Sequence, residues 1–383
     1  MKLTQRDHAH IWHPLTQHQT ARAPVGIVKA SGSVLIDEHG NSYIDGIASW
    51  YTAMFGHCNP YITQAMTKQM QTLDFVMFSG FTHEPAIELS EKLVAILPPN
   101  QQKVFFNDNG STAVEAAIKM AIQYYHNKSQ KRDTLIAFED GFHGDTFGAM
   151  SASGLSSYNG PFEDFLLKVK RIPTPQDHNL EEILALLTTI LEQNSCAGFI
   201  FEPLVQGAAG MKFHSAKGLD ALIAKCKAHD VLCIADEIMT GFGKTGTNFA
   251  VEQLQHTPDI MCLSKALTAG MFPLSITSCT QEIFDGFLSH QVHKGFFHAH
   301  TYSAHPVGCA AAIASIELLT SPEILKKRTY IAGAHSVFAE KIKQHPSVKQ
   351  VRYKGVILAI DLAIEMQRYG NLRDELYQFF MDR

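Results

Sequence analysis

The sequence predicts an α/β fold in which a mostly parallel central sheet is covered by helices, with a smaller α+β domain beside it. Between residues 104 and 278, short apolar stretches alternate with longer amphipathic ones. Two of the apolar stretches, 197–202 and 231–236, are almost continuously hydrophobic. Such strands are buried on both faces, and their alternation with helices is typical of parallel sheets. A chain of 383 residues is long enough for two domains.

The N-terminal part is predicted to hold a hairpin and two helices. Residues 1–30 show no clear periodicity and are expected to be irregular. Polarity alternates on both sides of the turn at 38–41, which is typical of a β-hairpin. The expected elements are hairpin strands at 33–36 and 42–44, a loop at 48–57 and helices at 60–72 and 84–96.

Strand–turn–helix units follow in the middle of the chain. Thr112 and Glu115 fit a capping box, so the first helix of this part is expected to open at Ser111 and Thr112. The predicted strands are 104–106, 134–138, 197–202, 231–236, 260–264 and 274–278, and the predicted helices are 111–126, 180–193 and 216–229.

The C-terminal part is predicted to be mainly helical, with helices at 306–319, 322–343 and from about 371, and one strand at 355–361. A domain with one clear strand is expected to be incomplete, so the natural chain is expected to be longer. The division expected from these patterns is an N-terminal segment 1–60, a large domain 61–305 and a small domain 306–383.

The composition limits the binding partners and the cellular compartment that can be expected for this chain. The net charge of -5 at pH 7 favours neither nucleic acid nor an anionic membrane surface. The seven cysteines are scattered without a C-x-x-C pair, which indicates free thiols in a reducing compartment. The sequence shows no signal peptide and no apolar run long enough to span a membrane. These observations predict a cytoplasmic protein.

Chemically useful side chains gather at the ends of the predicted strands. Gly110, Phe142, Glu202, Asp236 and Lys265 each lie at or just after such an end. In open α/β sheets, ligands bind at the carboxyl ends of the strands. We therefore expect these residues to surround one site.

Lys265 ends an apolar stretch and opens a glycine-rich turn. Burying a lysine as a cation is costly, and burial lowers its pKa and frees the amine for Schiff-base chemistry. Taken alone, this stretch favours the other interpretation, a strand-end cation that reaches solvent.

Three further features match the needs of one cofactor. Gly110 and Ser111 open a helix after a strand, where a phosphate is favoured, although simple helix capping explains them too. Asp236 ends an apolar strand and would keep a pyridine nitrogen protonated, unless it only caps the next turn. Phe142 offers a ring face for stacking, and His143 follows it. Together with a Schiff-base lysine, these features predict pyridoxal 5′-phosphate.

Two other motifs are rejected. Gly243-Lys244-Thr245 resembles the end of a phosphate-binding P-loop, but that motif needs a glycine where this chain has Ile238. His298 and His300 have a spacing that is seen in metal sites. Zinc sites usually add a third ligand close by, and the sequence offers none here, so no metal is predicted.

The sequence resembles the class III pyridoxal-phosphate aminotransferases over essentially its whole length. The resemblance rests on the Asp236-Glu237 pair, the Gly-Phe-Gly-Lys-Thr-Gly run at 241–246 and Lys265. Within the family, the sequence resembles the branch that acts in biotin biosynthesis. The closest stretches are the N-terminal Trp12-His13-Pro14, the pair Ser49-Trp50 and the runs at 76–78, 143–151 and 202–208. Members of that branch transfer an amino group from S-adenosylmethionine, or from lysine in some relatives, to a keto acid.

The resemblance implies the fold-type I architecture and a homodimer whose active sites are shared between subunits. By motif match, Lys265 would bind the cofactor covalently and Asp236 would hold its ring nitrogen. The remaining implied contacts are Gly110, Ser111, Phe142 and His143 for the cofactor, His300 and Thr301 from the partner subunit for its phosphate, and Trp50, Phe142, Ala299 and Leu15 for the substrate.

The chain departs from the best-known members at places that affect substrate choice. Leu15 and Phe142 stand where those members have tyrosines, and Ala299 replaces a glycine. The arginine expected to bind the keto acid's carboxylate would lie beyond Arg383. Three rival hypotheses remain open: another class III ω-aminotransferase for ornithine, 4-aminobutyrate or a polyamine, a nucleotide-binding protein that uses Lys244, and a non-catalytic binding protein.

Overall fold

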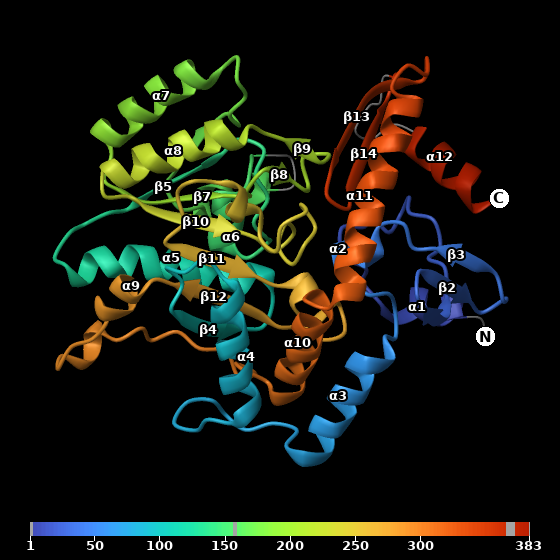
Figure 1. Ribbon diagram of the computed structural model, residues 1–383, viewed down its shortest axis with the longest axis horizontal. Helices are drawn as coiled ribbons and strands as arrows, with labels where there is room; N and C mark the ends of the chain where they lie inside the picture. The colour runs from blue at the N-terminus through green and yellow to red at the C-terminus, as the bar shows by residue number, and fades with distance from the viewer. Residues whose placement is uncertain (1–2, 156–158, 365–371, 383) are drawn as a thin grey trace.

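The computed structural model describes residues 3–155, 159–364 and 372–382, and it is built around one seven-stranded sheet (Figure 1). The strand order is β4-β12-β11-β10-β7-β5-β6. All neighbouring strands are parallel except at β12, which is antiparallel to both β11 and β4. The bounds are β4 Lys103–Asn107, β5 Thr134–Phe138, β6 Val169–Ile172, β7 Cys196–Phe201, β10 Leu232–Asp236, β11 Ile260–Leu263 and β12 Ser275–Cys279. The predicted mostly parallel sheet is confirmed.

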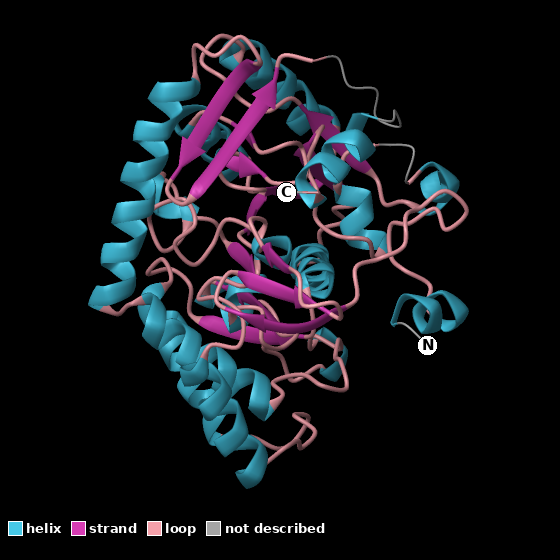
Figure 2. Cartoon of the chain, turned by 90° about the vertical axis from the view of Figure 1, so that its right-hand side faces the viewer, coloured by secondary structure: helices cyan, strands magenta, loops and turns pink. Residues whose placement is uncertain are grey.

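Helices cover both faces of this sheet, as Figures 1 and 2 show. One apolar cluster joins α5 (Gly110–Asn127) and α6 (Phe147–Ala152) to strand residues such as Leu135 and Ile234. The other joins α4 (Glu84–Ile96), α7 (Leu180–Gln193) and α8 (Ala216–Ala228) to the opposite face. Because β5, β7 and β10 are buried along their whole length, their side chains are apolar on both faces rather than alternating. The carboxyl ends of these parallel strands meet at one edge.

The N-terminal part contains two elements that the prediction of an irregular segment missed. They are α1 (Leu3–His10) and β1 (Ile27–Ser31). β1 pairs with β2 (Val34–Asp37), which pairs with β3 (Ser42–Ile44) in the predicted hairpin. β1 is mostly exposed and α1 has no buried residue, so neither shows the periodicity that reveals an element in sequence.

The C-terminal part packs beside the central sheet through α10 (Pro306–Leu319), which contacts α3 (Pro60–Thr72) and α4. The long helix α11 (Pro322–Ile342) lies against the antiparallel pair β13 (Val348–Lys354) and β14 (Ile357–Leu362). Sequence analysis found β14 but missed β13, because its residues are mostly charged or polar. The remaining elements are α2 (Ala48–Tyr51), β8 (Val205–Gln206), β9 (Lys212–Phe213), α9 (Gln281–Asp285) and α12 (Leu372–Met381).

In the described ranges, no single helix is both long and apolar enough to cross a membrane. Only α10 and α11 taken together pass that test, and they are bent by 67° at their junction. Most residues of α10 are buried within the protein. All seven cysteines are free thiols, and only Cys58 is exposed.

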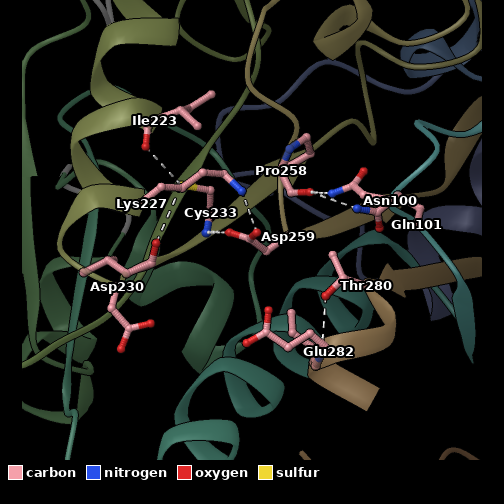
Figure 3. Close-up of polar contacts among 12 residues, drawn as sticks. Asn100, Gln101, Ile223, Lys227, Asp230, Cys233, Pro258, Asp259, Thr280 and Glu282 are labelled. Carbon is pink, nitrogen blue, oxygen red and sulfur yellow. Dashed lines mark hydrogen bonds and ion pairs between the residues drawn. The ribbon is translucent and has the colours of Figure 1, made fainter. Parts of the chain in front are cut away.

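Asp259 ties three elements together at the edge of the sheet opposite the strands' carboxyl ends (Figure 3). Its carboxylate accepts from Lys227 of α8 at 2.7 Å and from the backbone N–H of Cys233 at 2.7 Å. Its own backbone carbonyl accepts from the N–H of Thr280 at 3.2 Å. The preceding carbonyl, of Pro258, accepts from Asn100 and Gln101.

We expect Asp259→Ala to lower the free energy of unfolding by about 2 kcal/mol, because the buried N–H of Cys233 loses a charged acceptor. Lys227→Met is the matched control, since it removes only a partly exposed ion pair and should cost less than about 1 kcal/mol. Urea unfolding of both variants measures the difference. Equal losses in the two variants would mean that the ion pair, not the backbone contact, carries the stabilisation.

Candidate active site

Lys265 lies at the carboxyl edge of the central sheet. It is the second residue after the end of β11, and Ser264 lies between them. Burial lowers the pKa of its amine, while the carboxylates of Asp236 and Glu202 oppose that shift. The amine lies 5.9 Å from the centre of the Tyr51 ring. Lys265 is therefore a largely desolvated amine rather than a strand-end cation in solvent, and the charges of Asp236 and Glu202 act on it.

Asp236 ends the neighbouring strand β10 and is only 3 % exposed. One carboxylate oxygen lies 2.7 Å from Nδ1 of His143, and the other accepts from the backbone N–H of Ile238 at 3.1 Å. His143 thus donates from Nδ1 and fixes the carboxylate. The Nε2 atom of His143 is buried and has no hydrogen-bond partner among the described residues.

The turn between β4 and α5 forms the third corner of the site. Asn109 caps the helix, because its side chain accepts from the N–H of Thr112 and the Thr112 hydroxyl accepts from the N–H of Asn109. The predicted capping box that began at Thr112 is wrong: the cap lies three residues earlier. Helix α5 begins at Gly110, so Gly110 and Ser111 stand in its first turn, where an anion is favoured.

Close packing joins this turn to the segment that carries His143. The Ser111 hydroxyl accepts from the backbone N–H of Asp145 at 2.9 Å. Gly144 has φ of 127°, and a Cβ there would overlap the Ser111 hydroxyl. A Cβ on Gly110 would lie 3.1 Å from the side chain of Ile238. Three strand ends therefore meet at Gly110 and Ser111.

Glu202 holds the segment with Phe142 in place. Its two carboxylate oxygens accept from the backbone N–H groups of Phe142 at 3.0 Å and Gly207 at 2.9 Å. Burial raises the pKa of Glu202 to about 7. The Phe142 ring is 43 % exposed, so a flat ligand can reach it. Glu202 was predicted to lie at a strand end but without a role, although it follows an apolar strand just as Asp236 does.

A left-handed turn brings the Tyr51 ring to the site. Ala48, Ser49, Trp50 and Tyr51 all have positive φ, which costs about 1–2 kcal/mol per residue without glycine. Strain of this kind concentrates at functional sites. The turn places Tyr51 beside Lys265 and leaves Trp50 58 % exposed.

The other predicted site residues lie on the surface of the single chain. Leu15 is 74 % exposed, and Ala299 and Thr301 are exposed in the segment between β12 and α10. The side chain of His300 faces Asp108 and His298. Whether these residues reach a partner's site stays a prediction. Within residues 3–155, 159–364 and 372–382, no group of three metal-binding side chains is present.

Lys244 is a buried amine that sequence analysis treated only as part of a rejected P-loop. It is 7 % exposed, and its Nζ has no hydrogen-bond partner in the described part of the chain. Burial, with a smaller effect from the charge of Lys265, lowers the pKa of Lys244 to about 7. No α-helix follows directly: Gly246 has a positive φ and the next helical turn is the short 3-10 segment Ala250–Gln253.

Lys244→Met should therefore stabilise the cofactor-free protein at neutral pH by roughly 1–3 kcal/mol. The folded-state pKa lies below the unfolded value, so the unfolded state binds the proton more tightly and stability rises with pH above about 7. The gain from Lys244→Met should shrink toward pH 10. Thermal unfolding of this variant and of Lys217→Met, an exposed control on α8, measures it; a gain that does not depend on pH would contradict this account.

These side chains and the fold define an aminotransferase of the pyridoxal-phosphate-dependent type. The sequence profile of the family "Aminotransferase class-III" matches residues 15–378, and the chain belongs to this family. The chain is 44% identical over 370 residues to the adenosylmethionine-8-amino-7-oxononanoate aminotransferase of Synechococcus elongatus, covering 94% of this chain and 87% of that protein. It is 39% identical to the enzyme of that name from Geobacter sulfurreducens, covering 93% of this chain and 82% of that protein.

Solved structures of aminotransferases have the same fold as this chain. The crystal structure of the adenosylmethionine-8-amino-7-oxononanoate aminotransferase from Methanocaldococcus jannaschii matches with a TM-score of 0.93 and 33% identity, covering 99% of this chain and 90% of that chain. A thermostable omega-transaminase from Thermomicrobium roseum matches with a TM-score of 0.87 and 30% identity, covering 95% of this chain and 84% of that chain. The predicted family, the fold-type I architecture and enzymatic class are confirmed.

Proposed function

We propose that this enzyme transfers an amino group from S-adenosylmethionine to 8-amino-7-oxononanoate, giving 7,8-diaminononanoate for biotin biosynthesis. The observation that carries the proposal is the set of relatives with that name, which are 34–44% identical over more than nine-tenths of the chain. Two omega-transaminases of known structure that match the chain are less similar in sequence, at 27% and 30% identity.

The residues at the sheet edge fit pyridoxal 5′-phosphate. The first turn of α5, with Gly110 and Ser111, suits its phosphate. Asp236, held by His143, suits a protonated ring nitrogen. Phe142 offers a ring face, and Lys265 offers an amine with a lowered pKa. When bound, this cofactor supplies an electrophilic aldehyde and an electron-withdrawing ring.

The protein's own groups then have defined tasks. With the cofactor bound, the Nζ of Lys265 would hold it and, once released, would serve as the base that takes the proton from the carbon bearing nitrogen and returns a proton in the second half of the reaction. The Asp236 carboxylate would keep the ring nitrogen protonated. The Tyr51 ring, whose centre lies 5.9 Å from the Lys265 amine, would shield that amine from water, and Trp50 and Phe142 would line the substrate side.

The amino donor is tested directly by a substrate screen. We expect the purified enzyme with added pyridoxal phosphate to form 7,8-diaminononanoate, detected by mass spectrometry, from 8-amino-7-oxononanoate and S-adenosylmethionine. Lysine is the alternative donor, because Phe142 and Leu15 lack the hydroxyls of tyrosine. Turnover of ornithine, 4-aminobutyrate or a polyamine without 8-amino-7-oxononanoate would contradict the proposal in favour of another ω-aminotransferase.

We also propose a homodimer with shared active sites, in which Leu15, Ala299, His300 and Thr301 complete the partner's site. The exposure of Leu15, Ala299 and Thr301 in the single chain supports this. The proposed compartment is the cytoplasm, supported by the free thiols. The proposed units are the segment 1–60, the large domain 61–305 and the small domain 306–383. No sheet crosses from one unit to another, which supports this division: β1–β3 lie in the first, the seven-stranded sheet and the β8-β9 pair in the second, and the β13-β14 pair in the third.

A further inference from the structure

Two buried side chains beside the candidate active site carry polar atoms that need a partner. The Nε2 atom of His143 is buried and receives no hydrogen bond from residues 3–155, 159–364 or 372–382. The same holds for both amide atoms of the Gln206 side chain, which is 0 % exposed. A buried polar atom without a partner is costly, and native proteins pair most such atoms with protein groups or ordered water.

The place where a side chain would start on Gly141 brings these atoms together. A Cβ there would lie 3.2 Å from Nε2 of His143, 3.5 Å from the backbone oxygen of Phe138 and 3.8 Å from Nε2 of Gln206. Apart from residues 140–142, these are the three nearest heavy atoms, and all three are polar. We call this position the Gly141 notch. Its surroundings suit one water molecule, which needs about two to four polar partners.

Glu202 holds the two segments that form the notch. One of its carboxylate oxygens accepts from the N–H of Phe142, which follows Gly141 in the chain. The other accepts from the N–H of Gly207, which follows Gln206. Gly141 has no positive φ that would itself demand glycine. The missing side chain, rather than the backbone freedom of glycine, is therefore the property that this position uses.

A water molecule in the notch can bond all its neighbours, whatever the proton count of the histidine. Water donates and accepts, so it pairs with an imidazole nitrogen with or without a proton. The amide of Gln206 offers both an N–H donor and a C=O acceptor. The carbonyl of Phe138 accepts from the N–H of Gly141 at 3.3 Å and has a second lone pair. This mixture of donors and acceptors suits a neutral molecule better than an ion of either sign.

The two nitrogens of the His143 ring face different partners. Nδ1 lies 2.7 Å from a carboxylate oxygen of Asp236, whereas Nε2 lies 3.2 Å from the Gly141 notch. The hydrogen bond at one ring nitrogen of a histidine sets the orientation and tautomer available to the other. A water in the notch therefore holds the ring in the orientation that bonds Asp236.

We propose that an ordered water binds in the Gly141 notch between His143 and Gln206, and that Gln206 is a positioning residue that acts through this water and His143 on Asp236. The effect on the reaction rests on the proposed placement of the cofactor's ring nitrogen at Asp236. The water and the orientation of the His143 ring are properties of the cofactor-free protein, so they can be measured separately.

Gly141→Ala places a methyl group in the notch, and the chain offers a matched control. A Cβ on Gly198, in β7, would meet its three nearest neighbours at 3.2, 3.5 and 3.7 Å, almost the same distances as at Gly141. The nearest of them is the apolar Cδ1 atom of Ile234. Gly198→Ala therefore adds the same crowding without displacing a ligand from polar atoms.

Crystal structures of the cofactor-free protein test the water directly. The wild-type protein should show an ordered water within about 3.2 Å of Nε2 of His143 and of the Gln206 amide. Gly141→Ala should lose this water and turn the His143 ring away from Asp236. Gly198→Ala should keep both the water and the contact with Asp236.

Gln206→Met separates loss of the water from the crowding that a methyl group causes, because it removes the amide and leaves the notch open. We expect kcat to fall about 5–30-fold in Gly141→Ala and about 3–10-fold in Gln206→Met, with KM changed by less than about 2-fold. Combining the two substitutions should lower kcat no further than Gly141→Ala alone, because the water is already lost. The double variant should unfold at a higher temperature than Gly141→Ala, since it no longer buries an unpaired amide.

Four results would overturn the inference. They are a direct hydrogen bond between Gln206 and Nε2 of His143 in the wild-type crystal, a notch without density where other buried waters are visible, fully additive losses of kcat in the double variant, and equal kcat in Gly141→Ala and Gly198→Ala. If the wild-type protein transfers no amino group, the proposed function fails instead. The water and the ring orientation in the crystal structures then still decide the inference.

Discussion

Lys265→Ala should abolish amino transfer, with a loss of at least about 10³-fold in kcat for every donor. The expectation follows from the environment of the amine. Burial lowers the pKa of Lys265, so a larger share of the side chain is an uncharged base than for a lysine in water. Asp236 and Glu202 hold the pKa up, which keeps the amine able to take a proton as well as to attack a carbonyl.

The experiment needs a control that separates lost chemistry from lost folding. Visible absorption with borohydride reduction, followed by peptide mapping, should place the trapped cofactor on Lys265 in the wild-type protein. Lys265→Ala should retain its fold and bind pyridoxal phosphate without trapping it. Lys244→Met removes the other buried amine and should still trap the cofactor on Lys265. If borohydride trapped the cofactor of the wild-type protein on Lys244 instead, the assignment of Lys265 would be wrong.

The positions of Lys265 and Asp236 at the edge of the sheet could be predicted from sequence, because each lies at or just after the end of an apolar strand. A charged side chain at such a place is conspicuous, and parallel strands bring their carboxyl ends to one edge. Gly110 and Ser111 were predicted for the same reason: a strand, a short turn and a helix start follow one another. The mostly parallel sheet covered by helices is confirmed for this part of the chain, although strand β6 and helix α6 were not predicted.

The missed features depend on contacts that no local pattern encodes. The turn at Ala48–Tyr51 is left-handed without a glycine, so nothing in its residues predicts the conformation that brings Tyr51 to Lys265. Lys244 is buried by tertiary packing, and its motif gave no sign of that. β13 is a charged strand that exists because β14 supplies its hydrogen-bond partners.

Asp236→Asn should lower kcat by about 10²–10⁴-fold while leaving the fold intact. Two observations carry this expectation. The carboxylate is 3 % exposed, and His143 donates to it at 2.7 Å, so its charge and direction are fixed before any ligand binds. An amide of the same shape can still accept from the N–H of Ile238, so folding should survive. What it cannot do is keep a proton on the ring nitrogen by an opposite charge.

The distinguishing measurement for Asp236→Asn is the split between binding and chemistry. Because Gly110, Ser111 and Lys265 are untouched, the variant should still bind pyridoxal phosphate and be trapped on Lys265 by borohydride. The loss should therefore appear in kcat for both half-reactions. His143→Asn, which removes only the group that orients the carboxylate, should give a smaller loss of the same kind. If Asp236→Asn instead lost the cofactor but turned over normally once saturated, Asp236 would be a binding residue, and the proton on the ring nitrogen would have another source.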